Sequence, residues 1–159
     1  MEKELLEHMG FGKQNTFHED DYDNISQKYG VEELEHEHEA QLEQDYGNIF
    51  FLKNFPNNTS PFWNMLQHDD GKHAKKVDVI IHGIETIGSA QRSSNVDEMR
   101  KQFYNISDGN YANILFSNFT KERVEKELDE FLSFDFFERS GGGIGVTRMI
   151  RALKLSNLL

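Results

Sequence analysis

Two β-strand patterns at residues 77–81 and 84–87 constrain the fold of this chain more than any other feature. They consist mainly of Val and Ile, and His82-Gly83 separates them. A two-residue connection that ends in Gly is typical of a β-hairpin. Because side chains alternate between the two faces of a strand, this register predicts one common face. That face would carry Asp78, Ile80, Glu85 and Ile87.

The predicted hairpin makes Asp78 and Glu85 diagonal neighbours, within reach of one bound cation. Two carboxylates on an apolar face repel each other and lose hydration unless a positive charge lies between them. Oxygen ligands of this kind suit Mg²⁺ that carries nucleotide phosphates. The alternative is that one of the two carboxylates faces solvent at a strand edge.

A second feature is a glycine-rich stretch, Arg139 to Leu153, in which four glycines occupy positions 141–145. Glycine lacks a Cβ, so a ligand or a neighbouring strand can approach its backbone closely. The helical run that follows carries Arg148 and Arg151, and an arginine placed there can meet a phosphate or a carboxylate. Taken alone, the stretch could equally be a flexible loop.

The composition narrows the class of protein. The chain has 159 residues, a net charge of −11 and no cysteine. Its acidity argues against a surface on this chain alone that binds a duplex or tRNA backbone, because such surfaces are basic. We expect a cytoplasmic protein without a membrane partner, because no apolar run approaches the roughly 20 residues that span a bilayer and no signal peptide is apparent.

The strand and helix patterns together are typical of an α+β fold. Residues 1–38 are expected to form a polar, helical N-terminal segment, and the helix from Asp23 to about Tyr46 should break near Tyr29-Gly30. The run His36-Glu37-His38-Glu39 is interpreted as a solvated acidic face, because side chains at i and i+2 diverge on a helix.

Further along the chain, residues 48–55 predict a strand and residues 121–134 an amphipathic helix. We expect the aromatic residues around the end of this helix to be core residues packed under the glycine-rich strand. They are Phe134, Phe136 and Phe137.

In this order, three blocks resemble the C-terminal half of the catalytic domain of class II aminoacyl-tRNA synthetases of the aspartate/asparagine/lysine subclass. The resemblance covers residues 39–155, within an expected second domain at 39–159. With the strand content, it implies an antiparallel β-sheet flanked by helices that is incomplete, because some strands of the family's sheet are missing. The blocks are Phe50–Pro56 with Pro61–Met65, Val77–Arg92, and Gly142–Arg148, which is similar to the family's motif 3.

The resemblance implies an adenylate-forming ligase that uses ATP and Mg²⁺. Asp78 and Glu85 would bind the metal, with Glu85 and Arg148 as the catalytic pair. Arg148 would contact the γ-phosphate of ATP. The strand would form the floor under the nucleotide through Gly142, Gly143 and Gly145.

The same resemblance places Gln91 and Arg92 at the amino acid, with Arg92 paired to the side-chain end of bound aspartate or asparagine. By strict alternation Arg92 points away from Glu85, so it joins that site only if residues 88–90 form a bulge. Gly88 departs from the family, in which a serine that helps to hold the metal is common.

Three segments look more like archaeal-type asparagine synthetases than like the tRNA ligases, namely Thr86–Ala90, Gly141–Arg148 and Ala152–Leu155. The acceptor of those synthetases is ammonia, whereas the acceptor of the tRNA ligases is tRNA, and both remain open. No arginine occurs in residues 1–38, so motifs 1 and 2 are not found there. The alternative function is therefore a truncated, non-catalytic domain that acts as an interaction or regulatory piece. An exposed sheet edge would favour a homodimer or pairing with a complementing chain.

Overall fold

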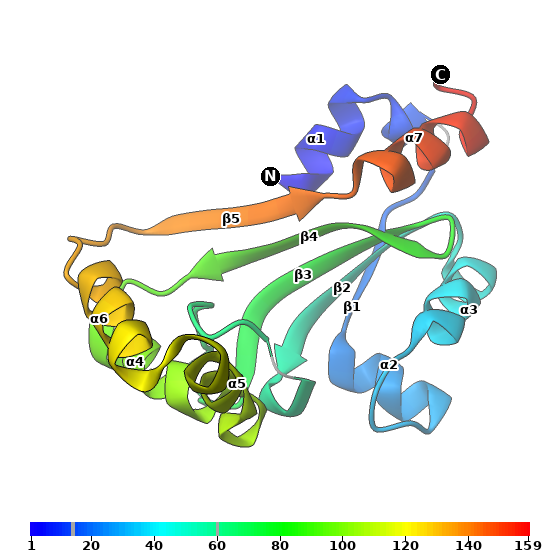
Figure 1. Cartoon of the computed structure of the whole chain (residues 1–159). Helices are drawn as coiled ribbons and strands as arrows, with labels where there is room; N and C mark the ends of the chain where they lie inside the picture. Colours follow the sequence, from blue (N-terminus) through cyan, green and yellow to red (C-terminus); the bar gives the residue numbers. More distant parts are fainter. Residues whose placement is uncertain (14, 60) are drawn as a thin grey trace. The chain divides into compact units, whose positions relative to one another are not determined.

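The computed structural model describes residues 1–13, 15–59 and 61–159. Five strands form one sheet in the order β1-β2-β3-β4-β5 (Figure 1). β1 pairs with β2 in parallel, and β3 and β4 are joined as an antiparallel hairpin. The strands are β1 (His18–Asp21), β2 (Ile49–Pro56), β3 (His73–Ile81), β4 (Ile84–Arg92) and β5 (Arg139–Ile144). The expected α+β fold with helices around the sheet is confirmed.

The chain divides into two compact units. The first comprises residues 1–55, 76–89 and 142–159, and the second comprises residues 56–75 and 90–141. The helices of the first unit are α1 (Glu2–His8), α2 (Tyr22–Tyr29), α3 (His36–Tyr46) and α7 (Val146–Leu155), with a 3-10 turn η1 (Phe11–Lys13). Those of the second are α4 (Val96–Asn105), α5 (Asn110–Phe119) and α6 (Lys121–Leu132), with η2 (Asn57–Thr59) and η3 (Ile106–Gly109).

In the first unit the sheet is covered on both faces (Figure 1). One core joins α1 and α7 to alternate strand residues such as Phe51, Val79 and Ile81. The other joins α2 and α3 to the intervening residues, among them Leu52 and Ile80. This burial of both faces explains why β2 and the end of β3 are nearly continuous runs of apolar residues.

The N-terminal part of the chain contains a strand that the sequence did not predict in the polar helical segment. Residues 18–21 form β1, whose register pairs His18 with Phe50 of β2. The sequence of β1 is His-Glu-Asp-Asp, which carries no β pattern, so its pairing with β2 decides its conformation. The helix break was predicted correctly: α2 ends at Tyr29, and Gly30 adopts a left-handed conformation with φ of 69°.

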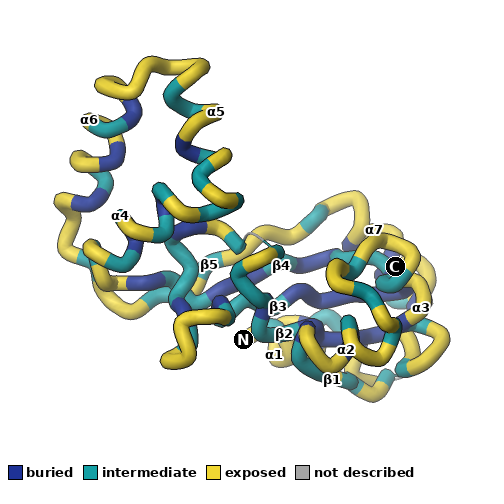
Figure 2. Tube along the Cα trace, turned by 90° about the horizontal axis from the view of Figure 1, so that it is seen from below, coloured by how far each residue is buried: buried dark blue, intermediate teal, exposed yellow. Residues whose placement is uncertain are grey.

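The second unit is built around Trp63, which packs with buried residues of α4, α5 and α6. Figure 2 shows buried positions alternating with exposed ones along these helices. The helix expected at 121–134 is present as α6, and its buried side chains, Val124, Leu128 and Leu132, follow the helical period. Phe134 and Phe137 are 66% and 74% exposed, so their assignment to the core was wrong. Only the third aromatic residue, Phe136, packs against this core.

Candidate functional site

The hairpin turn is the centre of the candidate site. His82 and Gly83 have φ values of 49° and 70°, as the connection of a two-residue hairpin with both central residues left-handed requires. A Cβ on Gly83 would lie 3.1 Å from the Cα of Ala40 in α3, so this position needs glycine for space as well as for conformation. The predicted turn is confirmed.

The common face predicted for the hairpin is only partly correct. Ile80 packs in the core beneath α2 and α3, whereas Ile87 packs in the core on the α1 and α7 face. The carboxylate of Glu85 nevertheless reaches the face of Asp78. A Cβ on Gly88 would lie 2.8 Å from Oε1 of Glu85 and 3.4 Å from Oδ1 of Asp78. Glu85 and Ile87 therefore depart from strict alternation, and the two carboxylates meet beside a glycine.

Asp78 is almost completely buried, with 7% of its surface exposed. Its Oδ2 accepts a hydrogen bond of 2.5 Å from Nζ of Lys76, and its buried Oδ1 has no partner among the described residues. Burial raises the pKa of Asp78 to about 6; the charge and hydrogen bond of Lys76 oppose the rise, while Glu85 and Glu39 add to it. Oδ1 of Asp78 is thus a buried acceptor to which no described residue donates.

Lys76 is a residue that the sequence analysis missed. Its Nζ lies 3.6 Å from the centre of the Phe55 ring, so a cation–π contact adds to the ion pair with Asp78. A signal was present in the sequence, because residues two apart on a strand share a face and Lys76 precedes Asp78 by two. The positive charge expected beside Asp78 is therefore already supplied in part by the chain itself.

Helix α3 contributes acidic side chains to the hairpin. Oε2 of Glu39 accepts a 2.8 Å hydrogen bond from the backbone N–H of Glu85. Oε1 of Glu43 lies 3.0 Å from Nδ1 of His82. The interpretation of residues 36–39 as a solvated face was wrong for Glu39, which bonds the hairpin, and for His38, whose Nδ1 accepts from the N–H of Glu35.

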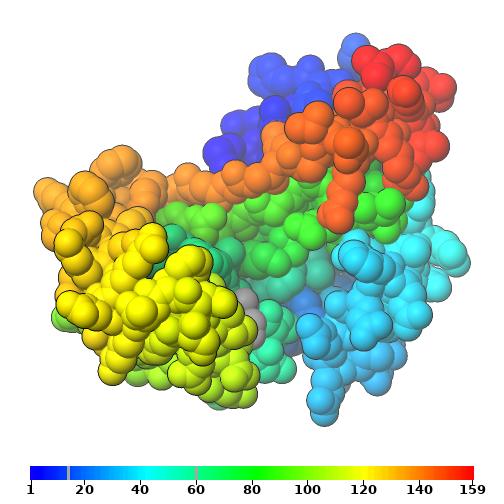
Figure 3. Space-filling view, in the orientation of Figure 1, coloured from blue at the N-terminus to red at the C-terminus, as the bar shows by residue number. Residues whose placement is uncertain are grey.

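Helix α7 contributes the two arginines. Nη1 of Arg148 donates to the backbone oxygen of Glu85 at 2.7 Å, and it lies 3.9 Å from Oε2 of the same residue. Nη1 of Arg151 donates to the backbone oxygen of His82 at 3.1 Å. Figure 3 shows the hairpin in green between α7, in orange to red, and α3, in cyan. The turn is thus held by acids of one helix and by arginines of another.

The glycines of β5 and of the start of α7 have different local roles. A Cβ on Gly142 would lie 2.5 Å from the backbone oxygen of Gly88, so close packing against β4 requires glycine there. A Cβ on Gly143 would meet nothing within 4 Å, which leaves this part of the strand open. Gly145 precedes α7, and a Cβ there would crowd Cδ of Arg148 at 3.2 Å.

Gln91 and Arg92 belong to the second unit. Nη1 of Arg92 donates to Oδ1 of Asn64 at 2.9 Å, and its Nη2 donates to the backbone oxygen of Gly141 at 3.2 Å. The backbone oxygen of Gln91 accepts from Leu66 at 2.9 Å. Burial, followed by the charge of Arg139, lowers the pKa of Arg92. Arg92 and Arg139 line one cavity of about 400 Å³, and Arg139 is a second residue that the sequence analysis missed.

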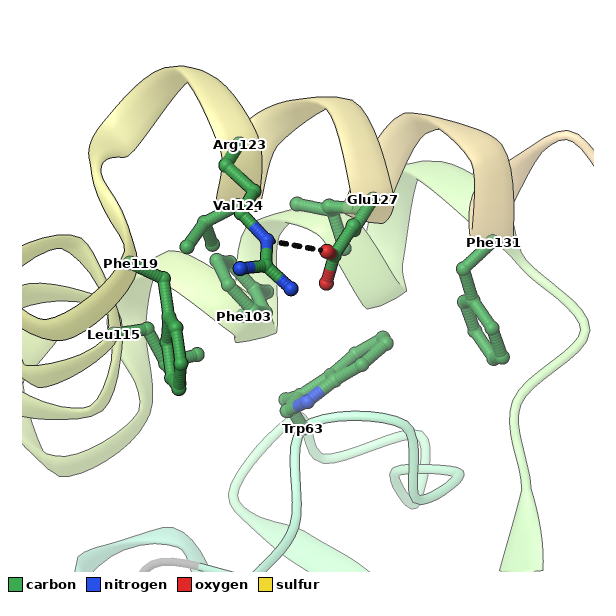
Figure 4. Close-up of a pocket in the computed structure, with 9 residues that line it drawn as sticks. Trp63, Phe103, Leu115, Phe119, Arg123, Val124, Glu127 and Phe131 are labelled. Carbon is green, nitrogen blue, oxygen red and sulfur yellow. Dashed lines mark hydrogen bonds and ion pairs between the residues drawn. The ribbon is translucent and has the colours of Figure 1, made fainter.

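A different cavity of the second unit, of about 310 Å³, is mainly apolar (Figure 4). Leu115, Val124 and aromatic rings line it, and the ion pair between Nε of Arg123 and Oε1 of Glu127, 2.9 Å apart, lies beside it. Its walls combine core side chains such as Trp63 and Leu128 with the exposed side chains of Phe119, Arg123 and Glu127.

Two features concern metals and membranes. Within the described ranges, no three His, Cys, Asp or Glu side chains are grouped so that they could hold a metal ion. Asp78 and Glu85 therefore form a pair of candidate oxygen ligands and not a complete protein site. No helix of the described residues is long and apolar enough to cross a membrane.

Comparison with protein families gives a match to the class II tRNA synthetases (D, K and N) over residues 2–157. The chain belongs to this family. The match confirms the resemblance proposed from the three sequence blocks, and it extends further towards the N-terminus than the expected residues 39–155. The boundary drawn between residues 38 and 39 stays a prediction.

Curated relatives with similar sequences are tRNA ligases. The chain is 30% identical to the asparagine–tRNA ligase of Mesoplasma florum over 106 residues, which are 63% of this chain and 19% of that protein. It is 26% identical to the aspartate–tRNA(Asp) ligase of Pyrobaculum aerophilum over 117 residues, which are 74% of this chain and 24% of the relative. The chain thus spans about a fifth to a quarter of these relatives.

The fold is also similar to solved structures. Asparaginyl-tRNA synthetase from Pyrococcus horikoshii, complexed with asparaginyl-adenylate, superposes with a TM-score of 0.66 at 19% identity. The similarity covers 96% of this chain and 36% of that one. At this level of identity the comparison establishes the fold.

Proposed function

We propose that this chain carries part of the active site of an ATP-dependent, adenylate-forming ligase that activates aspartate or asparagine. The observation that supports this most is the meeting of Asp78, Glu85 and Arg148 at one hairpin. Two carboxylates and an arginine suit a nucleotide bound with a divalent cation, since the cation and the guanidinium neutralise the charge of the phosphates.

The residues present fit Mg²⁺. Oδ1 of Asp78 is buried without a hydrogen-bond partner among the described residues, and Oε1 of Glu85 lies beside the same glycine. Mg²⁺ commonly takes one or two carboxylates and completes its shell with water and substrate phosphates, so a pair of ligands is sufficient. Bound there, the ion would supply Lewis-acid stabilisation of the charge that develops during phosphoryl chemistry.

Arg148 has the reach for a phosphate role. Its side chain is 45% exposed, so its guanidinium can exchange the oxygens of Glu85 for those of a γ-phosphate. Gly143 is open above its Cα, so a nucleotide could lie flat on this part of β5. In this proposal the backbone of Gly142, Gly143 and Gly145 lies beneath the bound nucleotide.

In the second unit, we assign the amino-acid contact to Arg92, with Gln91 beside it. Asn64 and the backbone oxygen of Gly141 fix the guanidinium of Arg92, which leaves it oriented towards a cavity. The names of the curated relatives indicate asparagine or aspartate as the amino acid and tRNA as the acceptor. Ammonia is the alternative acceptor. We also propose a cytoplasmic location and assembly as a homodimer or with a complementing chain.

Thermal unfolding of the full chain tests the nucleotide part. Saturating Mg²⁺·ATP at about 100 times its dissociation constant should stabilise the protein by about 2.7 kcal/mol, and this should raise Tm by about 5–10 °C for a chain of this size. Arg148→Ala should abolish the rise, whereas Lys154→Ala, on an exposed position of the same helix, should preserve it. No rise for the wild-type chain at millimolar Mg²⁺·ATP would favour the non-catalytic alternative.

The acceptor can be determined separately. The ammonia reading predicts release of AMP from ATP and aspartate when an ammonium salt is added without tRNA. If AMP appears only after tRNA is added, the asparagine synthetase assignment is wrong and the tRNA ligase assignment stands.

A further inference from the structure

The apolar cavity of the second unit is large enough to hold a small molecule (Figure 4). Its volume of about 310 Å³ lies at the lower end of the usual range of small-molecule sites. Well-packed cores contain few voids larger than a water molecule, and an apolar void of about 150 Å³ is sufficient to bind benzene. The lining comes entirely from the second unit: Trp63, Phe103, Leu115, Phe119, Arg123, Val124, Glu127, Leu128 and Phe131.

Aromatic rings form much of this lining. Trp63 makes edge-to-face contacts with Phe103 and Phe131, with ring centres 5.5 Å apart and ring planes at 84° and 81°. In Figure 4, Trp63 forms the base of the cavity. Phe131 lies on one side of it, and Leu115 and Phe119 lie on the other. Rings at right angles offer both edges and faces to a further ring, so the lining suits an aromatic ligand.

The charged side chains of the lining, Arg123 and Glu127, neutralise each other. Nε of Arg123 donates to Oε1 of Glu127 at 2.9 Å. The guanidinium carbon of Arg123 also lies 5.4 Å from the centre of the Phe119 ring. A charged ligand would therefore lose its hydration without gaining an unpaired partner of opposite charge. The lining favours an uncharged ligand.

The indole N–H of Trp63 adds one polar group. Nε1 is buried and bonds no acceptor among the described residues. In Figure 4 the nitrogen lies on the Leu115 side of the indole. Buried Trp N–H groups usually have a partner, and a buried donor without one is unfavourable. A ligand acceptor that bonded Nε1 would remove this penalty, whereas a hydrocarbon would leave it in place.

From these observations we propose that the cavity binds a small, uncharged aromatic molecule that carries one hydrogen-bond acceptor, such as an aryl ketone. The ring of the ligand lies among the aromatic side chains, and its acceptor bonds Nε1 of Trp63. The site uses none of the residues assigned to the nucleotide, namely Asp78, Glu85 and Arg148. It is therefore a binding function in addition to the proposed ligase chemistry.

Calorimetric titration of the full chain with acetophenone and, separately, with α-methylstyrene tests the proposal. The two compounds have nearly the same shape, but only the ketone offers a strong acceptor. Acetophenone should bind with a dissociation constant of about 0.1–1 mM, as expected for a ligand of this size. It should bind at least about threefold more tightly than α-methylstyrene, because of the hydrogen bond to Nε1.

Nuclear magnetic resonance locates the bound ligand. The chain contains one Trp, so a ¹H–¹⁵N correlation spectrum has one indole N–H signal. Because a hydrogen bond deshields the donated proton, this signal should shift downfield when acetophenone binds. The shift with α-methylstyrene should be smaller, since that compound brings a similar ring without the acceptor.

Three variants connect binding to the cavity. Leu115→Trp places a second indole in the cavity and should abolish binding. Ile114→Trp makes the same substitution at a neighbouring position that is 60% exposed and outside the lining, so it should retain the wild-type affinity. Phe119→Ala removes a wall without adding atoms and should weaken binding at least about threefold. Circular dichroism and Tm establish that each variant is folded.

Binding of neither compound at millimolar concentration would overturn the proposal, as would equal affinities for the ketone and the alkene. Wild-type affinity in folded Leu115→Trp or in Phe119→Ala would also overturn it, because the ligand would then bind elsewhere. Stabilisation by Mg²⁺·ATP is measured independently of this cavity, so the proposed nucleotide function can stand or fail separately.

Discussion

Replacing Asp78 by Asn should change how the stability of the protein depends on pH. The pKa of Asp78 is raised from 3.8 to about 6 in the folded state, chiefly because the carboxyl group is buried. Between these two values the folded state binds more protons at this site than the unfolded state does. The contribution to stability is therefore complete below about pH 3.8 and is lost as pH rises through about 6.

The magnitude follows from the size of the shift. One pKa unit corresponds to 1.36 kcal/mol, so a shift from 3.8 to about 6 corresponds to a loss of about 3 kcal/mol by neutral pH. Asn has nearly the same shape and carries no proton to lose, so Asp78→Asn should remove this loss. Since Lys76 loses its charged partner in the variant, the net gain at neutral pH should be less than 3 kcal/mol.

Urea unfolding in EDTA, followed by far-UV circular dichroism from pH 4 to pH 8, gives the required free energies. The difference between variant and wild type should move in favour of the variant as pH rises from 4 to 7. Asp69→Asn, at an exposed position, provides the control and should follow the wild-type curve. Parallel curves for Asp78→Asn and wild type would refute the reasoning, because they would show that the carboxyl group has the same pKa in both states.

Two further predictions concern packing, and urea unfolding measures both. Gly142→Ala should destabilise the protein by about 2 kcal/mol or more, because its Cβ would lie 2.5 Å from a backbone oxygen. Gly143→Ala places its Cβ in open space and should lower the free energy of unfolding by less than about 1 kcal/mol. Equal effects of the two variants would contradict the assigned roles. Leu128→Ala, in the core of the second unit, should lower the free energy of unfolding by about 2–5 kcal/mol. The control Ile114→Ala, at a position that is 60% exposed, should lower it by less than about 0.5 kcal/mol. A small effect of Leu128→Ala would mean that the neighbouring cavity collapses around the shortened side chain.

The hairpin and the helix break near Gly30 could be predicted because their signals are local. His82-Gly83 specifies a two-residue turn through the conformations that its residues tolerate, and Gly30 ends a helix for the same reason. The family blocks added the approximate place of the strands and of Arg148. Local patterns of this kind need no knowledge of which elements pack together.

The features that were predicted wrongly or not at all involve residues whose conformation or burial depends on partners far away in the sequence. β1 has four polar residues and becomes a strand only because β2 is available to pair with it. Phe134 and Phe137 are apolar side chains, yet most of the surface of each is exposed. The pairing of Arg92 with Arg139 in one cavity joins residues 47 positions apart in the chain, which no local pattern indicates.

The contacts at the hairpin turn have a consequence for local unfolding. The backbone oxygens of His82 and Glu85 accept from arginines of α7, and the backbone N–H of Glu85 donates to α3. The turn cannot open without breaking bonds to both helices. The amides of the hairpin, α3 and the first turns of α7 should therefore exchange their hydrogens with similar protection, as one cooperative opening unit.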